Sequence, residues 1–161
     1  MRVAVISDTH MPVNIRKFPE DFLEKLKGVD MIIHAGDLIE LSVLDELNKI
    51  APTKAVTGNM DSHKARKALP EKLILELGGF KIGVIHGLGH PDKILEYVME
   101  RFKDEKLDCI IYGHSHNPKI ETIEGTIYFN PGSMTDKVFA PYNSYGILEI
   151  DDKLTPKIVR L

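Results

Sequence analysis

Short apolar runs alternate with amphipathic segments through the first third of the chain. Residues 2–7, 30–35 and 53–57 are rich in aliphatic and β-branched side chains, as in strands buried on both faces. Residues 18–26 and 41–50 lie between these runs and place apolar side chains at helical spacing. This strand–helix–strand order predicts parallel strand pairing with crossover helices.

The pattern changes after about residue 70. Three pairs of runs separated by turn residues predict hairpins: 73–77 with 81–85, 119–123 with 126–130, and 145–150 with 155–160. A helix over 92–103 and a strand over 108–112 are predicted between the first two hairpins. Because strands far outnumber helices, some sheet faces must pack on sheet. The chain therefore predicts a single α/β domain over residues 1–161, with two stacked mixed sheets and helices outside.

Composition and charge narrow the classes of function. The net charge of −3 argues against an extended basic surface for nucleic acid or anionic lipid. Cys109 is the only cysteine and lies in an apolar run, so we expect a buried thiol, no disulfide and a reducing, cytoplasmic compartment. The N-terminus becomes polar too soon for a signal peptide, and no apolar run approaches ~18 residues, so no membrane span is expected.

Five short polar clusters each follow an apolar run. They are Asp8-Thr9-His10, Gly36-Asp37, Gly58-Asn59-Met60-Asp61, His86-Gly87 and Gly113-His114-Ser115-His116. Side chains at the carboxyl ends of strands in an open α/β sheet converge on one crevice. One such cluster alone is most simply a turn. Five of them, each at a predicted strand end, indicate a metal site.

The residue types indicate which metals the site would bind. Asp8 and His10 are separated by one residue, as are His114 and His116, and in extended backbone such pairs point to the same side. Imidazole excludes a pure Mg or Ca site, and the absence of thiolate ligands argues against a structural zinc site. We expect two adjacent divalent ions from among Mn, Fe, Co, Ni and Zn, with Mn or Ni favoured.

The five clusters in this order resemble the calcineurin-like metallophosphoesterases, whose pattern is D-x-H, GD, GN-x-[DE], H and GH-x-H. Asn130-Pro131-Gly132-Ser133 follows the last cluster as it does in the small single-domain bacterial and archaeal phosphodiesterases of that superfamily. The resemblance extends from Val3 to about Ser133. It implies a four-layer α-β-β-α sandwich.

The resemblance also implies a role for each cluster. One ion would be held by Asp8, His10, Asp37 and His116, and Asp37 would bridge to a second ion held also by Asn59, His86 and His114. The implied activity is a metal-dependent phosphodiesterase in which a hydroxide bound to both ions attacks the phosphorus of a small phosphodiester in line. Asn59 and Asp61 are the expected catalytic residues. Such a site carries a net charge of about +1 toward the substrate, so it needs no basic patch.

Position 60 departs from the pattern of many family members. They carry a His there that protonates the leaving group, whereas the thioether of Met60 has no proton to donate. His63 could replace it as an acid that contacts the substrate, although a surface position at a basic helix start is the favoured interpretation. For His90, a loop position at a helix start is favoured over contact with the substrate.

Four further expectations concern residues around the site, the class of protein and its oligomeric state. His34 is expected to be buried, either in the core or orienting a metal ligand by a hydrogen bond. Residues 130–133 are most simply a turn, with a phosphate-facing role as the second interpretation. The alternative to an enzyme is a non-catalytic metal-binding or protein-interaction scaffold of the same fold, like the retromer subunit that resembles these enzymes. A symmetric homo-oligomer is compatible with the sequence.

Overall fold

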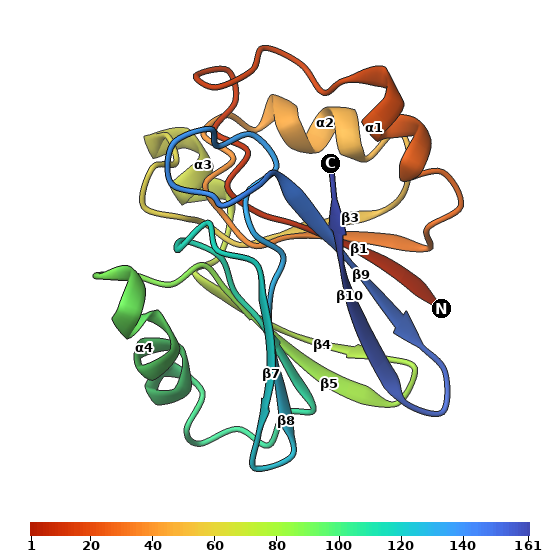
Figure 1. The fold of residues 1–161 in the computed structure, drawn as a ribbon, viewed down its shortest axis with the longest axis vertical. Helices are drawn as coiled ribbons and strands as arrows, with labels where there is room; N and C mark the ends of the chain where they lie inside the picture. The colour runs from red at the N-terminus through yellow and green to blue at the C-terminus, as the bar shows by residue number, and fades with distance from the viewer.

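The computed structural model describes all 161 residues, which form two five-stranded sheets stacked on one another (Figure 1). The strands are β1 (Arg2–Ile6), β2 (Met31–His34), β3 (Thr53–Ala55), β4 (Lys72–Leu77), β5 (Phe80–Ile85), β6 (Cys109–Ile111), β7 (Lys119–Ile123), β8 (Thr126–Asn130), β9 (Ser144–Ile150) and β10 (Leu154–Arg160). The first sheet has the order β10-β9-β1-β2-β3 and the second β4-β5-β6-β8-β7. Both are mixed, as predicted: β1, β2 and β3 are parallel in the first, and β5, β6 and β8 in the second.

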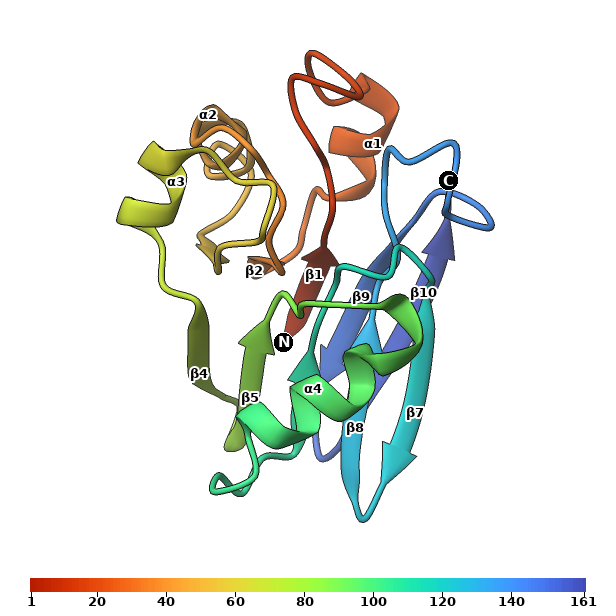
Figure 2. The ribbon, with the colours of Figure 1, turned by 90° about the vertical axis from the view of Figure 1, so that its left-hand side faces the viewer.

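Four short helices complete the fold. They are α1 (Glu20–Lys25), α2 (Ser42–Leu47), α3 (His63–Ala68) and α4 (Ile94–Arg101), the last preceded by a 3₁₀ turn, η1 (Pro91–Lys93). Figures 1 and 2 show α1 and α2 over the outer side of the first sheet and α4 over the outer side of the second. The order of layers is therefore helix, sheet, sheet, helix, which confirms the expected sandwich.

Alternating side chains on each strand fill separate apolar cores between these layers. On β1, Ala4 and Ile6 belong to the core beneath α1 and α2, whereas Val3 and Val5 belong to the core between the sheets. On β6, Cys109 and Ile111 face the core between the sheets, and Ile110 faces the core beneath α4. A central strand thus buries both faces, which explains the continuous apolar runs. Burial raises the pKa of the Cys109 thiol to about 12, so this cysteine is inert.

The helices differ from their predicted lengths for local reasons. The helix predicted over 41–50 ends at Leu47, and the chain continues in a tighter turn in which Ile50 N donates to Leu47 O at 2.9 Å. The helix predicted over 92–103 begins as the 3₁₀ turn at Pro91 and becomes α-helical at Ile94. Strands 119–123 and 126–130 have the predicted bounds. No helix has the length and apolar character needed to cross a membrane.

The core between the sheets should dominate stability. Replacing Ile82 of β5, which is fully buried there, by Ala should lower the free energy of unfolding of the metal-free protein by about 2–5 kcal/mol. The same substitution at Ile74 of neighbouring β4, which is 43% exposed, should cost less than about 1 kcal/mol. Urea unfolding followed by circular dichroism measures both. Equal losses would contradict this description of the core.

Candidate metal centre

The polar clusters lie where the parallel strands of both sheets end. Asp8 follows β1, Asp37 follows β2 and Asn59 follows β3, all in the first sheet. His86 directly follows β5, and His114 and His116 follow β6, in the second sheet. The carboxyl ends of the two sets meet, because His86 Nδ1 of the second sheet lies 2.7 Å from the Ala35 carbonyl oxygen of the first. One crevice therefore receives ligands from both sheets.

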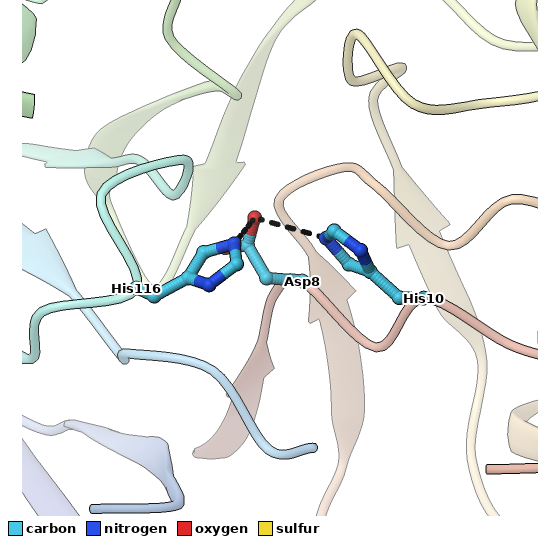
Figure 3. A group of neighbouring side chains, drawn as sticks. All are labelled: Asp8, His10 and His116. Carbon is cyan, nitrogen blue, oxygen red and sulfur yellow. Dashed lines mark ion pairs between the residues drawn. The ribbon is translucent and has the colours of Figure 1, made fainter. Parts of the chain in front are cut away.

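The fully buried Asp8 carboxylate lies at the centre of this crevice. Its Oδ1 is 3.2 Å from His116 Nε2 and 3.8 Å from both His10 Nε2 and His86 Nε2. Figure 3 shows the rings of His10 and His116 directed at this oxygen from opposite sides. Cis ligands of a divalent ion with bonds near 2.1 Å lie about 3 Å apart. The separation of 3.2 Å is close to that value, and the two of 3.8 Å would shorten on binding of an ion.

The second carboxylate lies between two of the same imidazoles. Asp37 Oδ2 is 3.5 Å from His10 Nε2 and 3.2 Å from His86 Nε2. Two overlapping groups of possible metal ligands result, Asp8 with His10 and His116, and Asp8 with Asp37 and His86, each with its ligand atoms within 4.8 Å of one another. Asp8 belongs to both groups, and Asp37 of the second group lies 3.5 Å from His10 of the first.

Hydrogen bonds fix which nitrogen of each ring faces the centre. His86 Nδ1 donates to the Ala35 carbonyl, and His116 Nδ1 donates to the carboxylate of Asp136. In both rings this leaves Nε2 toward the centre as the lone-pair atom of the neutral form, as is usual for ligating histidines.

Several of these inward-facing atoms have no hydrogen-bond partner in the protein. Asp8 Oδ1, His10 Nε2 and His86 Nε2 are buried and unpaired. Unpaired buried polar atoms are costly and rare in a native protein, so three at one point need an explanation. A divalent cation with oxygen and imidazole ligands satisfies all three at once, and the residues fit such an ion.

His114 and Asn59 form a further pair at the edge of the crevice. His114 Nε2 lies 2.8 Å from the Gly89 carbonyl oxygen, which can only accept, and His114 Nδ1 lies 2.8 Å from Asn59 Oδ1. When Nε2 of the neutral ring donates to Gly89, Nδ1 and Oδ1 face each other as two acceptors. The pair offers two lone-pair atoms to a cation, and without one the Asn59 amide can turn so that its Nδ2 donates to His114 Nδ1.

Charge and burial perturb the titration of the central groups. Burial opposes ionisation of Asp8 and Asp37, but the surrounding histidines hold the pKa of both carboxyls well below its usual range. Burial likewise opposes protonation of His10 and His86, yet the two carboxylates raise the pKa of His10 to about 10 and that of His86 to about 9. The cluster thus retains positive charge near the carboxylates at neutral pH when no metal is bound.

The backbone around the ligands is not extended, contrary to the prediction for the two spaced pairs. Five predicted ligands adopt left-handed backbone conformations, with φ of 54° at Asp8, 45° at His10, 57° at Asp37, 68° at His114 and 55° at His116. Each costs roughly 1–3 kcal/mol for a non-glycine residue. Asp8 and His10 do aim at one point, whereas His116 faces Asp8 and His114 faces Asn59.

Two glycines leave no room for a side chain beside the carboxylates. A Cβ at Gly58 would lie 2.1 Å from Asp37 Oδ1, and a Cβ at Gly113 would lie 2.0 Å from Ser7 Oγ. Ser7 Oγ itself donates to Asp8 Oδ2 at 2.6 Å. The glycines in these clusters therefore serve close packing around Asp8 and Asp37.

Asp61, predicted to act in catalysis, is buried and bonded to the backbone. One carboxylate oxygen accepts from Ile39 N at 2.6 Å and the other from Gly58 N at 2.7 Å. It therefore ties the loop after β2 to the loop after β3. Asp37 Oδ1 accepts from Met60 N at 2.7 Å, which adds a second tie. This geometry gives Asp61 a positioning role for the loops that carry Asp37 and Asn59.

The remaining predicted histidines lie apart from the crevice or beneath it. His63 is exposed at the first residue of α3, and His90 is exposed at the start of η1, where its ring accepts from Asp92 N at 3.4 Å. His63 thus occupies the surface position at a helix start, and His90 the loop position at a helix start, that the sequence analysis favoured. His34 is fully buried; its Nδ1 accepts from Gly36 N at 3.2 Å, and burial lowers its pKa to about 4. It therefore orients, as a neutral ring, the loop that carries Asp37.

The end of β8 and the loop after it position the central side chains through Asn130 and Ser133, which the sequence analysis placed in a turn, and through Asp136, which it missed. Asp136 accepts from His116 Nδ1, and its carboxylate also accepts from the backbone N–H groups of residues 138–140. Ser133 Oγ donates to the Asp8 carbonyl at 2.8 Å. Asn130 Nδ2 donates to the Gly113 carbonyl at 2.9 Å. The sequence offered one indication of this, because β8 is a further parallel strand and a loop at its carboxyl end is expected to border the crevice.

The chain belongs to the calcineurin-like phosphoesterase superfamily, whose domain model matches residues 1–153. A protein of Methanothermobacter thermautotrophicus named "Probable metallophosphoesterase" is 36% identical over 99% of this chain and 92% of its own. A protein of Methanocaldococcus jannaschii named as a phosphodiesterase is 30% identical over 99% of each chain. Wild-type Vps29 of Entamoeba histolytica, in a crystal structure complexed with Zn²⁺, is 26% identical over 99% of each chain, with a TM-score of 0.76. Family and site together support a metal-dependent phosphoesterase.

Metal binding should release protons at neutral pH. His10 and His86, with pKa values raised to about 10 and about 9, are protonated at pH 7.5 without metal, and coordination requires their neutral form. Loading should therefore release about two protons per chain, and affinity should rise with pH up to about 9–10. Titration calorimetry in two buffers of different ionisation enthalpy measures the release. The variant His10→Gln should release about one proton fewer; no release from the wild type at pH 7.5 would contradict the assignment.

Asp136 should strengthen metal binding through His116. The change Asp136→Asn keeps an oxygen for the loop N–H groups but removes the negative charge from His116 Nδ1, so affinity for one ion should fall about 10–100-fold. Asp92→Asn, at an exposed carboxylate in η1, is the matched control and should bind as the wild type does. Equilibrium dialysis with metal analysis measures both variants. Unchanged affinity in Asp136→Asn would show that the contact does not act on the metal.

Proposed function

We propose that the protein is a phosphodiesterase that works with two divalent transition-metal ions. The observation that supports this most directly is the convergence of unpaired, buried ligand atoms of Asp8, His10 and His86 from two sheets onto one point. Similarity to a relative named as a phosphodiesterase supports the choice of a diester substrate. When bound, such ions make water nucleophilic near neutral pH and neutralise charge on the phosphate.

The chain's own residues would hold and orient this centre. Asp8, His10, Asp37 and His116 would hold one ion, and Asp37, Asn59, His86 and His114 the other. Because Asp37 Oδ2 lies between His10 and His86, it is the proposed bridge. Bonds from Ser7, Ser133 and Asp61 hold the two carboxylate-bearing loops in place. Such preorganisation avoids rearrangement during the reaction.

The structure offers no evident proton donor at position 60. Met60 is 54% exposed at the position where many family members carry His, and its thioether cannot protonate a leaving group. His63 lies at the exposed start of α3 and is not among the residues that line the cavity beside the metal centre. Substrates whose leaving groups need no proton are therefore favoured over substrates whose leaving groups depart as alkoxides.

The proposal predicts a preference among substrates. After removal of metal with a chelator and reloading with Mn, Ni, Co, Fe or Zn in turn, the protein should hydrolyse bis-p-nitrophenyl phosphate at least about a hundredfold faster than glycerol phosphate. Nitrophenolate and inorganic phosphate release measure the two rates. Comparable rates on both substrates would refute the role assigned to Met60, and no hydrolysis with any metal would favour the scaffold alternative.

Two variants complete this test. Asp37→Asn is the same size as the wild-type residue but lacks the proposed bridging charge, so it should lose both ions together and abolish hydrolysis. His63→Ala should retain the wild-type rate, since this ring lies outside the crevice. Full occupancy of one ion in Asp37→Asn would argue against a bridge, and a large loss of rate in His63→Ala would reassign that histidine.

A further inference from the structure

A cavity of about 310 Å³ opens directly beside the metal centre. Its lining includes Asn59 and His86 of the crevice, Arg66 of α3, and Tyr97 and Arg101 of α4. Figure 1 shows α3 and α4 on the same side of the molecule, and both helices contribute residues to the lining of the cavity. A substrate held at the metal centre would extend into it.

The cavity carries one cation that the protein does not neutralise. Arg101 donates to Tyr97 Oη at 3.1 Å and pairs with Glu71 at 3.5 Å. Glu71 is the only acidic residue in the lining. Arg66 is exposed in the same lining, and its side chain has neither an ion-pair partner nor a hydrogen bond. Among the arginines and carboxylates of the lining, one positive charge is therefore in excess, and it is located on the guanidinium group of Arg66.

The rest of the lining suits a compact organic group. Ile85, Leu88 and the ring of Tyr97 supply an apolar wall, and Leu88 is 53% exposed. A pocket with an apolar wall and a few fixed polar groups binds a small organic ligand in one orientation. A planar guanidinium offers paired N–H donors that match the oxygens of a phosphate group.

We propose that this cavity binds a second phosphate group of the substrate, and that Arg66 determines this specificity. The inference rests on the proposed function, since it takes the metal centre to hold the scissile diester. The preferred substrate class is then a nucleotide diester that carries another phosphate on the same nucleoside. The sugar and base would contact Leu88 and Tyr97, and Arg66 would bind the second phosphate.

A pair of matched substrates tests this specificity. Thymidine 5′-(p-nitrophenyl phosphate) and the same compound with an added 3′-phosphate differ only in the second phosphate group, and both release nitrophenolate. The wild type should show a KM about tenfold lower for the 3′-phosphorylated compound. In Arg66→Gln the KM values of the two compounds should become equal.

The control variant is Lys67→Gln, which removes the same charge from the same helix at an exposed residue outside the cavity lining. It should keep the tenfold preference. Equal KM values in the wild type, or a preference retained in Arg66→Gln, would overturn the proposal. Loss of the preference in Lys67→Gln as well would also overturn it, because the effect would then be one of general charge.

A binding measurement separates this inference from the proposed function. In calorimetry, the wild type should bind thymidine 3′,5′-bisphosphate about tenfold more tightly than thymidine 5′-monophosphate. Arg66→Gln should bind the two compounds with equal affinity. If no diester is hydrolysed with any metal, the proposed function fails, whereas this Arg66-dependent difference still supports the cavity's ligand. If diesters are hydrolysed and the difference is absent, only the inference fails.

Discussion

The buried charge of Asp8 is the constraint on which the rest of the site depends. Its backbone N–H donates to the Gly36 carbonyl, its carbonyl accepts from Ser133 Oγ, and its Oδ2 accepts from Ser7 Oγ and His114 N. These bonds hold the backbone of Asp8 and one oxygen of its carboxylate, but none of them satisfies Oδ1. A buried carboxylate oxygen left in this way is tolerated only beside positive charge. Histidinium supplies that charge without metal, and a divalent ion supplies it when bound.

The same constraint explains why the ligand loops adopt unusual backbone conformations. Both parallel strand sets end at the crevice, so their loops must turn sharply to keep the carboxylates and imidazoles within reach of one another. Left-handed backbone at non-glycine residues achieves these turns, and its cost is met by the three packed cores and by buried bonds such as those of Asp61. Where the backbone passes closest to a carboxylate, at Gly58 and Gly113, no side chain fits.

The periodicity of the sequence predicted the strands well because burial on one or two faces leaves a direct trace in residue type. The hairpin of β7 and β8 has its predicted bounds, and β1 and β6 have the continuous apolar character of central strands. The convergence of acidic and imidazole side chains on one crevice was predictable because strand ends and metal-binding residue types coincide. The left-handed backbone conformation of Asp8 was not predictable, because an Asp after a strand has the same sequence pattern whether its backbone is extended or left-handed. Asp136 was missed because a single Asp in a polar loop shows its partner, His116, only in three dimensions.

The architecture separates the chemistry of the site from its selectivity. The central carboxylates and imidazoles come from loops anchored on both sheets, so substitutions there disturb the fold and the charge balance together. Arg66, Tyr97 and Arg101 instead come from α3 and α4, whose exposed faces take no part in holding the carboxylates. Helices at the periphery can therefore change their exposed residues without moving Asp8 or Asp37. It follows that selectivity among phosphate esters should be encoded in the residues of α3 and α4 that line the cavity, while the central site stays fixed by the two sheets.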